Sequence, residues 1–65
     1  MNKWIPRKQE LPEKSGYYLV TIKDSTFPAT LYFFHSDCTW RDEHMISYPV
    51  IAWMPLPKIY VEPKL

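Results

Sequence analysis

The sequence predicts a small all-β domain, and three of its features support that prediction. Aromatic residues make up 17% of the 65 residues, and there are seven prolines but only one glycine. So many prolines disfavour a helical bundle, and so many aromatic residues disfavour a disordered chain. Apolar segments of six or seven residues alternate with polar turns, as strands do. We therefore expect a single domain over residues 1–65, built as an antiparallel meander of three to five strands with at most one short helical turn.

The first fourteen residues are expected to form an arm that packs on the sheet. They contain Pro6 and Pro12 and residues of both charges. Residues 7–11 can form one helical turn at most, because a proline disfavours helical backbone in the residue before it. Ser15-Gly16, which contains the single glycine, is the clearest turn signal.

Tyr17 to Lys23 is the strongest predicted strand, since it is rich in β-branched and aromatic residues. Side chains alternate between the two faces of a strand. One face is expected to carry Tyr18, Val20 and Ile22, and the other Leu19 and Thr21.

Further strands are expected at four places. Residues 41–47 are polar and fit either a loop or a helical turn. Pro55-Leu56-Pro57 ends the strand expected at residues 48–54, because two prolines cannot both serve a central ladder. Short connections make neighbouring strands antiparallel. The expected strands are residues 29–34, a short 38–40, 48–54 and an edge strand at 59–61.

The second strand is expected to be apolar on both faces, because Leu31, Tyr32, Phe33 and Phe34 follow one another. A single sheet cannot cover both faces of such a strand. The second face therefore needs a cover, which can be the Trp4-Ile5 arm, the tail from Leu56 to Val61 or another chain. We expect both the N-terminal and the C-terminal arm to pack on the sheet.

The core of so small a domain is expected to contain its largest side chains. Tyrosines 17, 32 and 60 fit either a core or a protein interface. The expected structural core is Trp4, Leu19, Val20, Ile22, Ile51 and Trp53.

Charge and cysteine content exclude several classes of function. The net charge is +1, from eight Lys and Arg against seven Asp and Glu, which argues against general nucleic-acid binding. A single cysteine forms no internal disulfide and fits a reducing compartment. The chain has no long apolar run and no signal-peptide pattern. We expect a cytoplasmic protein that does not enter the membrane.

His35, Cys38 and His44 are the one group with metal-ligand side chains. A structural zinc site needs four ligands, usually in paired short spacings, and the fourth ligand here would be an arbitrary carboxylate among Asp37, Asp42 and Glu43. A Cys–His nucleophile would need an oxyanion pocket, and no Gly-rich loop or helix start is predicted that could form one. We therefore expect no metal, no cofactor and no enzymatic activity.

Several short segments carry a resemblance to a known family. These are Trp4-Ile5 at the start, Leu11-Pro12-Glu13, the strand residues Tyr18-Leu19-Val20 and the closing segment from Trp53 to Pro57. With them the chain resembles the phage- and prophage-encoded family called domain of unknown function 551. That family often has a histidine directly before the closing tryptophan, where this chain has Ala52. The resemblance implies a small cytoplasmic accessory product of a bacteriophage.

These observations predict a non-enzymatic binding protein that acts by protein–protein contact. Inhibition by occlusion suits a tiny domain because it needs a surface and no catalytic machinery. With the family resemblance, the expected partner is a host bacterial protein, such as a component of antiviral defence. Aromatic and Met anchors with an Arg are typical of such contacts. The expected contact residues are Tyr32, Phe34, Trp40, Arg41 and Met45.

Two alternatives stay open at this stage. One is a homo-oligomeric sponge that sequesters a small nucleotide signal between aromatic rings and an arginine. The other is an accessory structural module of a phage assembly. In either case the surplus of apolar surface leaves self-association open.

Overall fold

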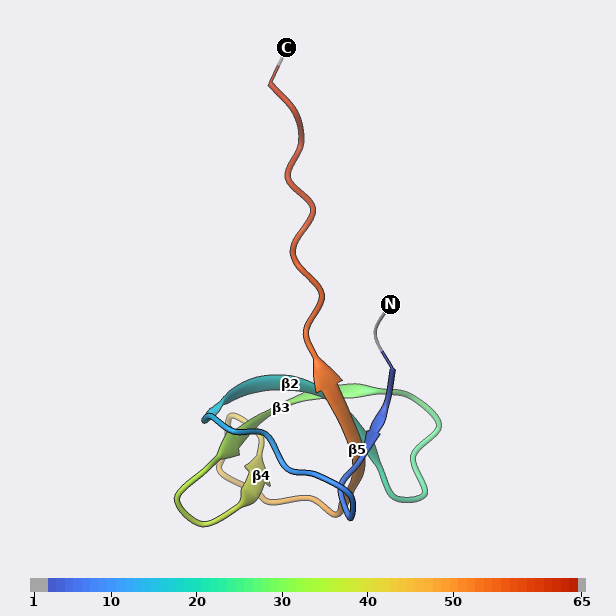
Figure 1. Cartoon of the computed structure of the whole chain (residues 1–65), viewed down its shortest axis with the longest axis vertical. Helices are drawn as coiled ribbons and strands as arrows, with labels where there is room; N and C mark the ends of the chain where they lie inside the picture. Colours follow the sequence, from blue (N-terminus) through green and yellow to red (C-terminus); the bar gives the residue numbers. More distant parts are fainter. Residues whose placement is uncertain (1–2, 65) are drawn as a thin grey trace.

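The chain forms one five-stranded antiparallel sheet, and residues 3–64, which the structure describes, contain no helix (Figure 1). The structure is a computed structural model. The prediction of a small all-β meander is confirmed. The strands are β1 (Ile5–Pro6), β2 (Gly16–Ile22), β3 (Ala29–Phe34), β4 (Thr39–Arg41) and β5 (Val50–Pro55).

The strand order in the sheet is β1-β5-β2-β3-β4. Strands β2, β3 and β4 follow one another as hairpins, whereas β5 returns to lie between β1 and β2. Trp53 of β5 consequently stands opposite Ile5 on one side and opposite Val20 on the other. The last strand of the chain is thus an interior strand of the sheet.

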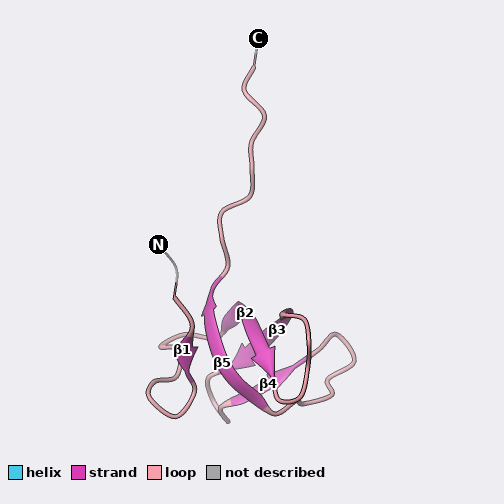
Figure 2. Ribbon diagram, turned by 90° about the vertical axis from the view of Figure 1, so that its right-hand side faces the viewer, coloured by secondary structure: helices cyan, strands magenta, loops and turns pink. Residues whose placement is uncertain are grey.

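The sheet is curled, and the chain after β4 turns back along β4 before it enters β5. Arg41 and Ser47 form an isolated antiparallel bridge, and the N–H of Tyr48 donates to the carbonyl of Trp40 at 3.0 Å. Figure 2 shows the strands wrapped around a common centre. The curl gives the sheet an inner face that holds the core and an outer face that faces solvent.

The core follows from the alternation of side chains along each strand. Tyr18 and Ile22 of β2 are partly buried against it, as the sequence predicted for that face. Phe33 and Val20 are completely buried. The buried apolar residues are Val20, Leu31, Phe33, Trp40, Val50 and Trp53.

Three expected core residues lie elsewhere. Trp4 is 42% exposed because it precedes β1 rather than lying under the sheet. Ile51 is 50% exposed, since the pairing of β2 with β5 shifts between Thr21 and Ile22 and leaves Ile51 as the extra residue of a bulge. Leu19 is partly buried, but alternation places it on the outer face of β2.

The turns differ from the expected pattern at the single glycine. Gly16 is the first residue of β2, and its φ is not positive. Left-handed backbone occurs instead at three non-glycine positions, with φ of 65° at Asp24, 57° at Cys38 and 64° at Met45. The glycine therefore marks the start of a strand and not a left-handed turn.

The N-terminal arm packs on the sheet, as expected. The N–H groups of Gln9 and Glu10 both donate to the carbonyl of Pro6, which forms the one short turn of this segment. Pro12 is buried, and Leu11 is partly buried against the core. The arm covers part of the inner face and leaves the outer face open.

The C-terminal arm does not pack on the sheet, and the expected edge strand at residues 59–61 does not form. After β5 the chain continues away from the sheet as an extended tail (Figure 1). Ile59 is 85% and Tyr60 83% exposed. Pro55 and Pro57 explain this, since they lack the N–H groups that a continued ladder with β2 would use.

The described part of the chain also lacks any helix with the length and apolar character that crossing a membrane requires.

Candidate functional site

The candidate site is a group of aromatic side chains on the outer face of the three-stranded half of the sheet. Tyr17 of β2 pairs with Tyr32 of β3, and Tyr32 pairs with Arg41 of β4, so these residues form one row across three strands. Phe34 lies two residues further along β3 and therefore on the same face. We call Tyr17, Tyr32, Phe34, Arg41 and Met45 the outer patch.

The rings of the outer patch pack against one another. The ring centroids of Tyr17 and Tyr32 are 4.9 Å apart in an edge-to-face arrangement, and those of Tyr32 and Phe34 are 4.8 Å apart. These are favourable distances for aromatic pairs. Tyr17 remains 64% exposed. The patch is therefore an ordered apolar surface that still faces solvent.

Arg41 is held over the patch by three contacts. Its Cζ lies 5.7 Å from the centroid of the Phe34 ring, within cation–π range. Its Nε–H donates to Thr39 Oγ1 at 3.1 Å, and its Nη2 lies 3.6 Å from Asp37 Oδ2. The hydroxyl of Thr39 donates to Asp37 Oδ1 at 2.6 Å, and this bond, helped by the Arg41 charge, lowers the pKa of Asp37. The Arg41 guanidinium is thus already engaged.

Met45 reaches the edge of the patch on a loop that Asp42 organises. Asp42 Oδ1 accepts from the N–H of His44 at 2.8 Å and of Ile46 at 3.1 Å. Asp42 Oδ2 accepts from the hydroxyl of Tyr48 at 2.7 Å. The Tyr48 bond, followed by the two main-chain bonds, lowers the pKa of Asp42, and the same bond raises the pKa of Tyr48.

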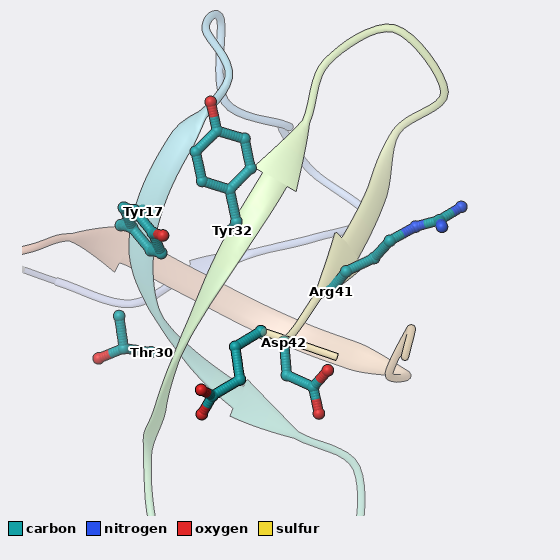
Figure 3. Close-up of a pocket in the computed structure, with 6 residues that line it drawn as sticks. Tyr17, Thr30, Tyr32, Arg41 and Asp42 are labelled. Carbon is teal, nitrogen blue, oxygen red and sulfur yellow. The ribbon is translucent and has the colours of Figure 1, made fainter. Parts of the chain in front are cut away.

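A groove of about 370 Å³ lies beside the row of paired residues (Figure 3). A second hollow of similar volume continues it past Phe34 and Met45. Figure 3 shows the Arg41 side chain directed away from Tyr17 and Thr30, on the far side of the groove. The groove is lined by Tyr17, Thr30, Tyr32, Arg41, Asp42 and Glu43.

The charges around the patch are predominantly negative. Asp37, Asp42 and Glu43 surround it, and Arg41 is the basic residue among those that line the groove. Because that guanidinium is already paired with Asp37, the carboxylate of Glu43 is the charge most open to an incoming group. Such a surface suits apolar and basic side chains and repels phosphate.

Four of the five expected contact residues come together in the outer patch: Tyr32, Phe34, Arg41 and Met45. The fifth, Trp40, does not belong to the surface, because it is 2% exposed and packs against Phe33 with ring centroids 4.6 Å apart. In β4 it lies between Thr39 and Arg41, so alternation turns it to the inner face.

Sequence reasoning left Tyr17 open between a core and an interface role, and it missed Glu43 as the charge beside it. Tyr17 faces Tyr32 through the register of the β2–β3 hairpin, and the loop of residues 23–28 leaves that register open in the sequence. Glu43 lies in the loop after β4, where the sequence left the conformation open.

The residues with metal-ligand side chains do not form a site. His35 and Cys38 lie in the β3–β4 turn, and His44 lies in the loop after β4. The N–H of His35 donates to Ser15 Oγ at 2.8 Å, which ties that turn to the start of β2. Within residues 3–64 no group of three or more His, Cys, Asp or Glu residues has the arrangement to hold a metal ion.

Comparison of the chain with protein-family models, with curated proteins and with solved structures finds no match.

Proposed function

We propose that this protein is a non-enzymatic binding module that contacts another polypeptide through the outer patch. The observation that carries the proposal is the row of Tyr17, Tyr32 and Arg41 across three strands, extended by Phe34. Tyr17 and Met45 of this patch are exposed, and the other three side chains are half-buried. An ordered aromatic surface with one arginine has the composition of the energetic centre of protein interfaces. No segment among residues 3–64 packs over it.

The charge of the groove defines the partner further. Glu43 and Asp42 stand beside exposed rings, so the surface favours a segment that presents a Lys or Arg next to β-branched or aromatic side chains. An extended segment fits best, because the groove runs beside the sheet and is continued by the second hollow.

The same charges argue against the nucleotide sponge. A nucleotide brings at least one phosphate, and here it would meet the Asp42 and Glu43 carboxylates while the Arg41 guanidinium is paired with Asp37. Aromatic rings alone do not compensate for that repulsion.

The family resemblance supplies the biological setting of the proposal. A phage accessory protein with a ready-made contact surface would act on a host bacterial protein in the cytoplasm, and a component of antiviral defence is the partner we propose. Occupying the surface of such a component would be sufficient to inhibit it.

The test compares binding by the protein and by matched surface variants. The intact protein is used to capture partners from a bacterial lysate, and each captured protein is purified and titrated by calorimetry. We expect Tyr32→Ser to weaken binding about tenfold or more, since a central interface tyrosine commonly contributes that much. Ile51→Ser is the control, because Ile51 is a solvent-exposed apolar side chain on the bulge of β5, outside the patch.

A charge-reversal pair tests the chemistry of the partner. Glu43→Lys should weaken binding of a basic segment, whereas Glu13→Lys, in the exposed N-terminal arm, should leave binding unchanged. The proposal fails if Tyr32→Ser and Ile51→Ser bind equally well. It also fails if nucleotides, and no protein, raise the melting temperature of the folded chain.

A further inference from the structure

The extended tail has the sequence pattern of a β-strand but no sheet to join within its own chain. Odd positions of the tail are apolar (Pro57, Ile59, Val61 and Pro63), and the even positions from Lys58 to Lys64 are polar or amphipathic. This period of two is the signature of a strand with one buried side. The exposed fractions of Ile59 and Val61, 85% and 74%, show that this side is uncovered.

The prolines limit where such a strand can begin and end. Pro57 and Pro63 bracket residues 58–62, which keep all their N–H groups. A ladder formed by the tail is therefore restricted to these five residues. Bracketing of this kind also prevents the uncontrolled edge-to-edge growth to which an exposed apolar strand is prone.

The sheet has a free edge beside the groove. β2 pairs with β3 from Ala29 to Phe33, but β4 pairs with β3 only at residues 32–34. The N–H of Cys38 donates to the carbonyl of Phe34, so Phe34 directs its main-chain groups toward β4. By alternation Tyr32 and Thr30 do the same. Thr30 therefore directs its N–H and C=O to the place that β4 leaves empty.

The tail of the same copy cannot reach this edge. Met54 to Pro57 are held extended, because Pro55 and Pro57 fix their own φ and restrict the residue before each. Measured along the sheet, the free edge lies three strand spacings from β5, or about 14 Å. Ile59 is two residues beyond Pro57 and can move at most about 7 Å from it. The strand can only be used by another molecule.

We infer that Ile59–Val61 of one copy add as an antiparallel strand to the free edge of β3, residues 29–31, in a second copy. Tyr60 then lies opposite Thr30 and beside the exposed ring of Tyr17 and the half-buried ring of Tyr32. In this orientation Lys58 comes to the end of the groove where Asp42 and Glu43 stand. Main-chain hydrogen bonds hold the added strand at the edge of β3, and the attraction between Lys58 and the two carboxylates favours the antiparallel orientation.

Exchange of tails between two copies closes a two-fold dimer, in which each copy donates one strand and accepts one. The inference rests on the proposed function, since the tail is an extended basic and apolar segment of the kind proposed for the groove. The tail of the second copy occupies the groove first, so any other partner must displace that tail.

The first test measures self-association by sedimentation velocity over a wide range of concentration. The intact chain should show a monomer–dimer equilibrium. The double variant Ile59→Pro/Tyr60→Pro should weaken dimerisation about tenfold or more. Adjacent residues direct their N–H groups to opposite edges of a strand, so in either register one of the two prolines removes an N–H that would bond to β3. Leu56→Pro/Lys64→Pro is the control, since both positions lie outside residues 58–62. Circular dichroism should show the same sheet in every variant.

The second test distinguishes exchange from simple pairing of two tails. Thr30→Pro removes the N–H at the free edge, and alternation places that N–H outside the β2–β3 ladder. The tail variant and the Thr30→Pro variant should each be monomeric. Mixed together they should form a heterodimer, because one intact tail still meets one intact edge. A fluorophore on Cys38, the single and exposed cysteine, reports it.

The outcomes separate this inference from the proposed function. A chain that stays monomeric at every concentration overturns tail exchange, as does a mixture that forms no heterodimer while the Leu56→Pro/Lys64→Pro control still dimerises. A captured partner whose binding is lost with Tyr32→Ser supports the proposed function even then. If instead the chain dimerises as described and Tyr32→Ser binds its partner normally, the proposed function falls and tail exchange stands.

Discussion

The indole Nε1–H of Trp53 donates a hydrogen bond of 2.8 Å to the main-chain carbonyl of Glu10, and so fixes the N-terminal arm to the interior strand β5. The second buried tryptophan has no such partner, since Trp40 Nε1 is buried without a hydrogen bond. A buried donor without a partner costs free energy, whereas a satisfied one contributes about 0.5–1.5 kcal/mol.

The two tryptophans should therefore respond differently to the same substitution. Trp53→Phe loses the bond to Glu10 and should lower the free energy of unfolding by about 1–3 kcal/mol. Trp40→Phe removes an unpaired donor and should cost less than Trp53→Phe. Urea denaturation followed by circular dichroism measures both. Equal losses would show that ring volume, and not the hydrogen bond, decides the cost.

Stability should fall in acid because of Asp42 and Asp37. Their pKa values are lowered in the folded protein, chiefly by the hydroxyl hydrogen bonds of Tyr48 and Thr39. A group with a lowered folded pKa stabilises the protein above its unfolded pKa, near pH 4 for aspartate, and that contribution is lost as the pH falls through the folded pKa. The urea midpoint should therefore decrease below about pH 4.

Tyr48→Phe is the variant that isolates the Asp42 contribution. It removes the largest cause of the low Asp42 pKa, so its urea midpoint should depend less on pH in the acid range than that of the parent chain. Thr39→Ala should do the same through Asp37. An unchanged acid dependence in both variants would contradict the assignment. The raised pKa of Tyr48 makes stability depend on pH in the opposite direction at the alkaline end. Its contribution to stability is lost as the pH rises through that pKa.

Adjacent residues of β2 should differ sharply in their contribution to stability. Val20 is completely buried, so Val20→Ala should cost about 2–3 kcal/mol from lost transfer energy and the cavity left behind. Leu19 is only partly buried on the outer face, and Leu19→Ala should cost less even though it deletes more atoms. Thermal denaturation of the two variants provides the comparison. A larger loss for Leu19→Ala would mean that the outer face is covered in solution.

The β3–β4 turn contains strain that one substitution should relieve. Cys38 has a φ of 57°, and left-handed backbone is costly for a residue with a Cβ. Cys38→Gly should raise the free energy of unfolding by up to about 1 kcal/mol. Ser36→Gly, in the same turn but without a positive φ, is the control and should not stabilise. Stabilisation by both variants would indicate an effect unrelated to the left-handed position.

Sequence patterns predicted β2 to β5 to within one or two residues because these strands depend on local alternation, whereas β1 was not predicted and the expected strand at 59–61 does not form. The range of β3 matches the expected residues 29–34, and Val20 and Trp53 lie in the core as expected. Trp4 and Ile51 were misplaced because their burial depends on where β1 begins and on a bulge in β5, which are properties of pairing between distant segments. Trp40 was placed on the surface because its short strand gave no alternation to assign its face.

The sequence predicted which types of residue form the candidate site better than it predicted which particular residues belong to it. Tyr32 and Phe34 share an alternation that the sequence shows, whereas Arg41 joins them through the pairing of β3 with β4. Tyr17 joins them only through the register of the β2–β3 hairpin, and the sequence did not fix that register. The tail was expected to cover the sheet, but the prolines that end β5 also direct the chain away from it.

The position of β5 between β1 and β2 has a consequence for how the chain is made. The strand that occupies the interior of the sheet is the last to be synthesised, so β1 has no neighbour until residues 50–55 have emerged. Native pairing of Ile5 with Trp53 spans most of the chain, and contacts of such sequence separation slow folding. The nascent chain is thus held back from a complete sheet until β5 has emerged. A truncation before residue 50 should leave a hairpin unit without its closing strand rather than a smaller version of the domain.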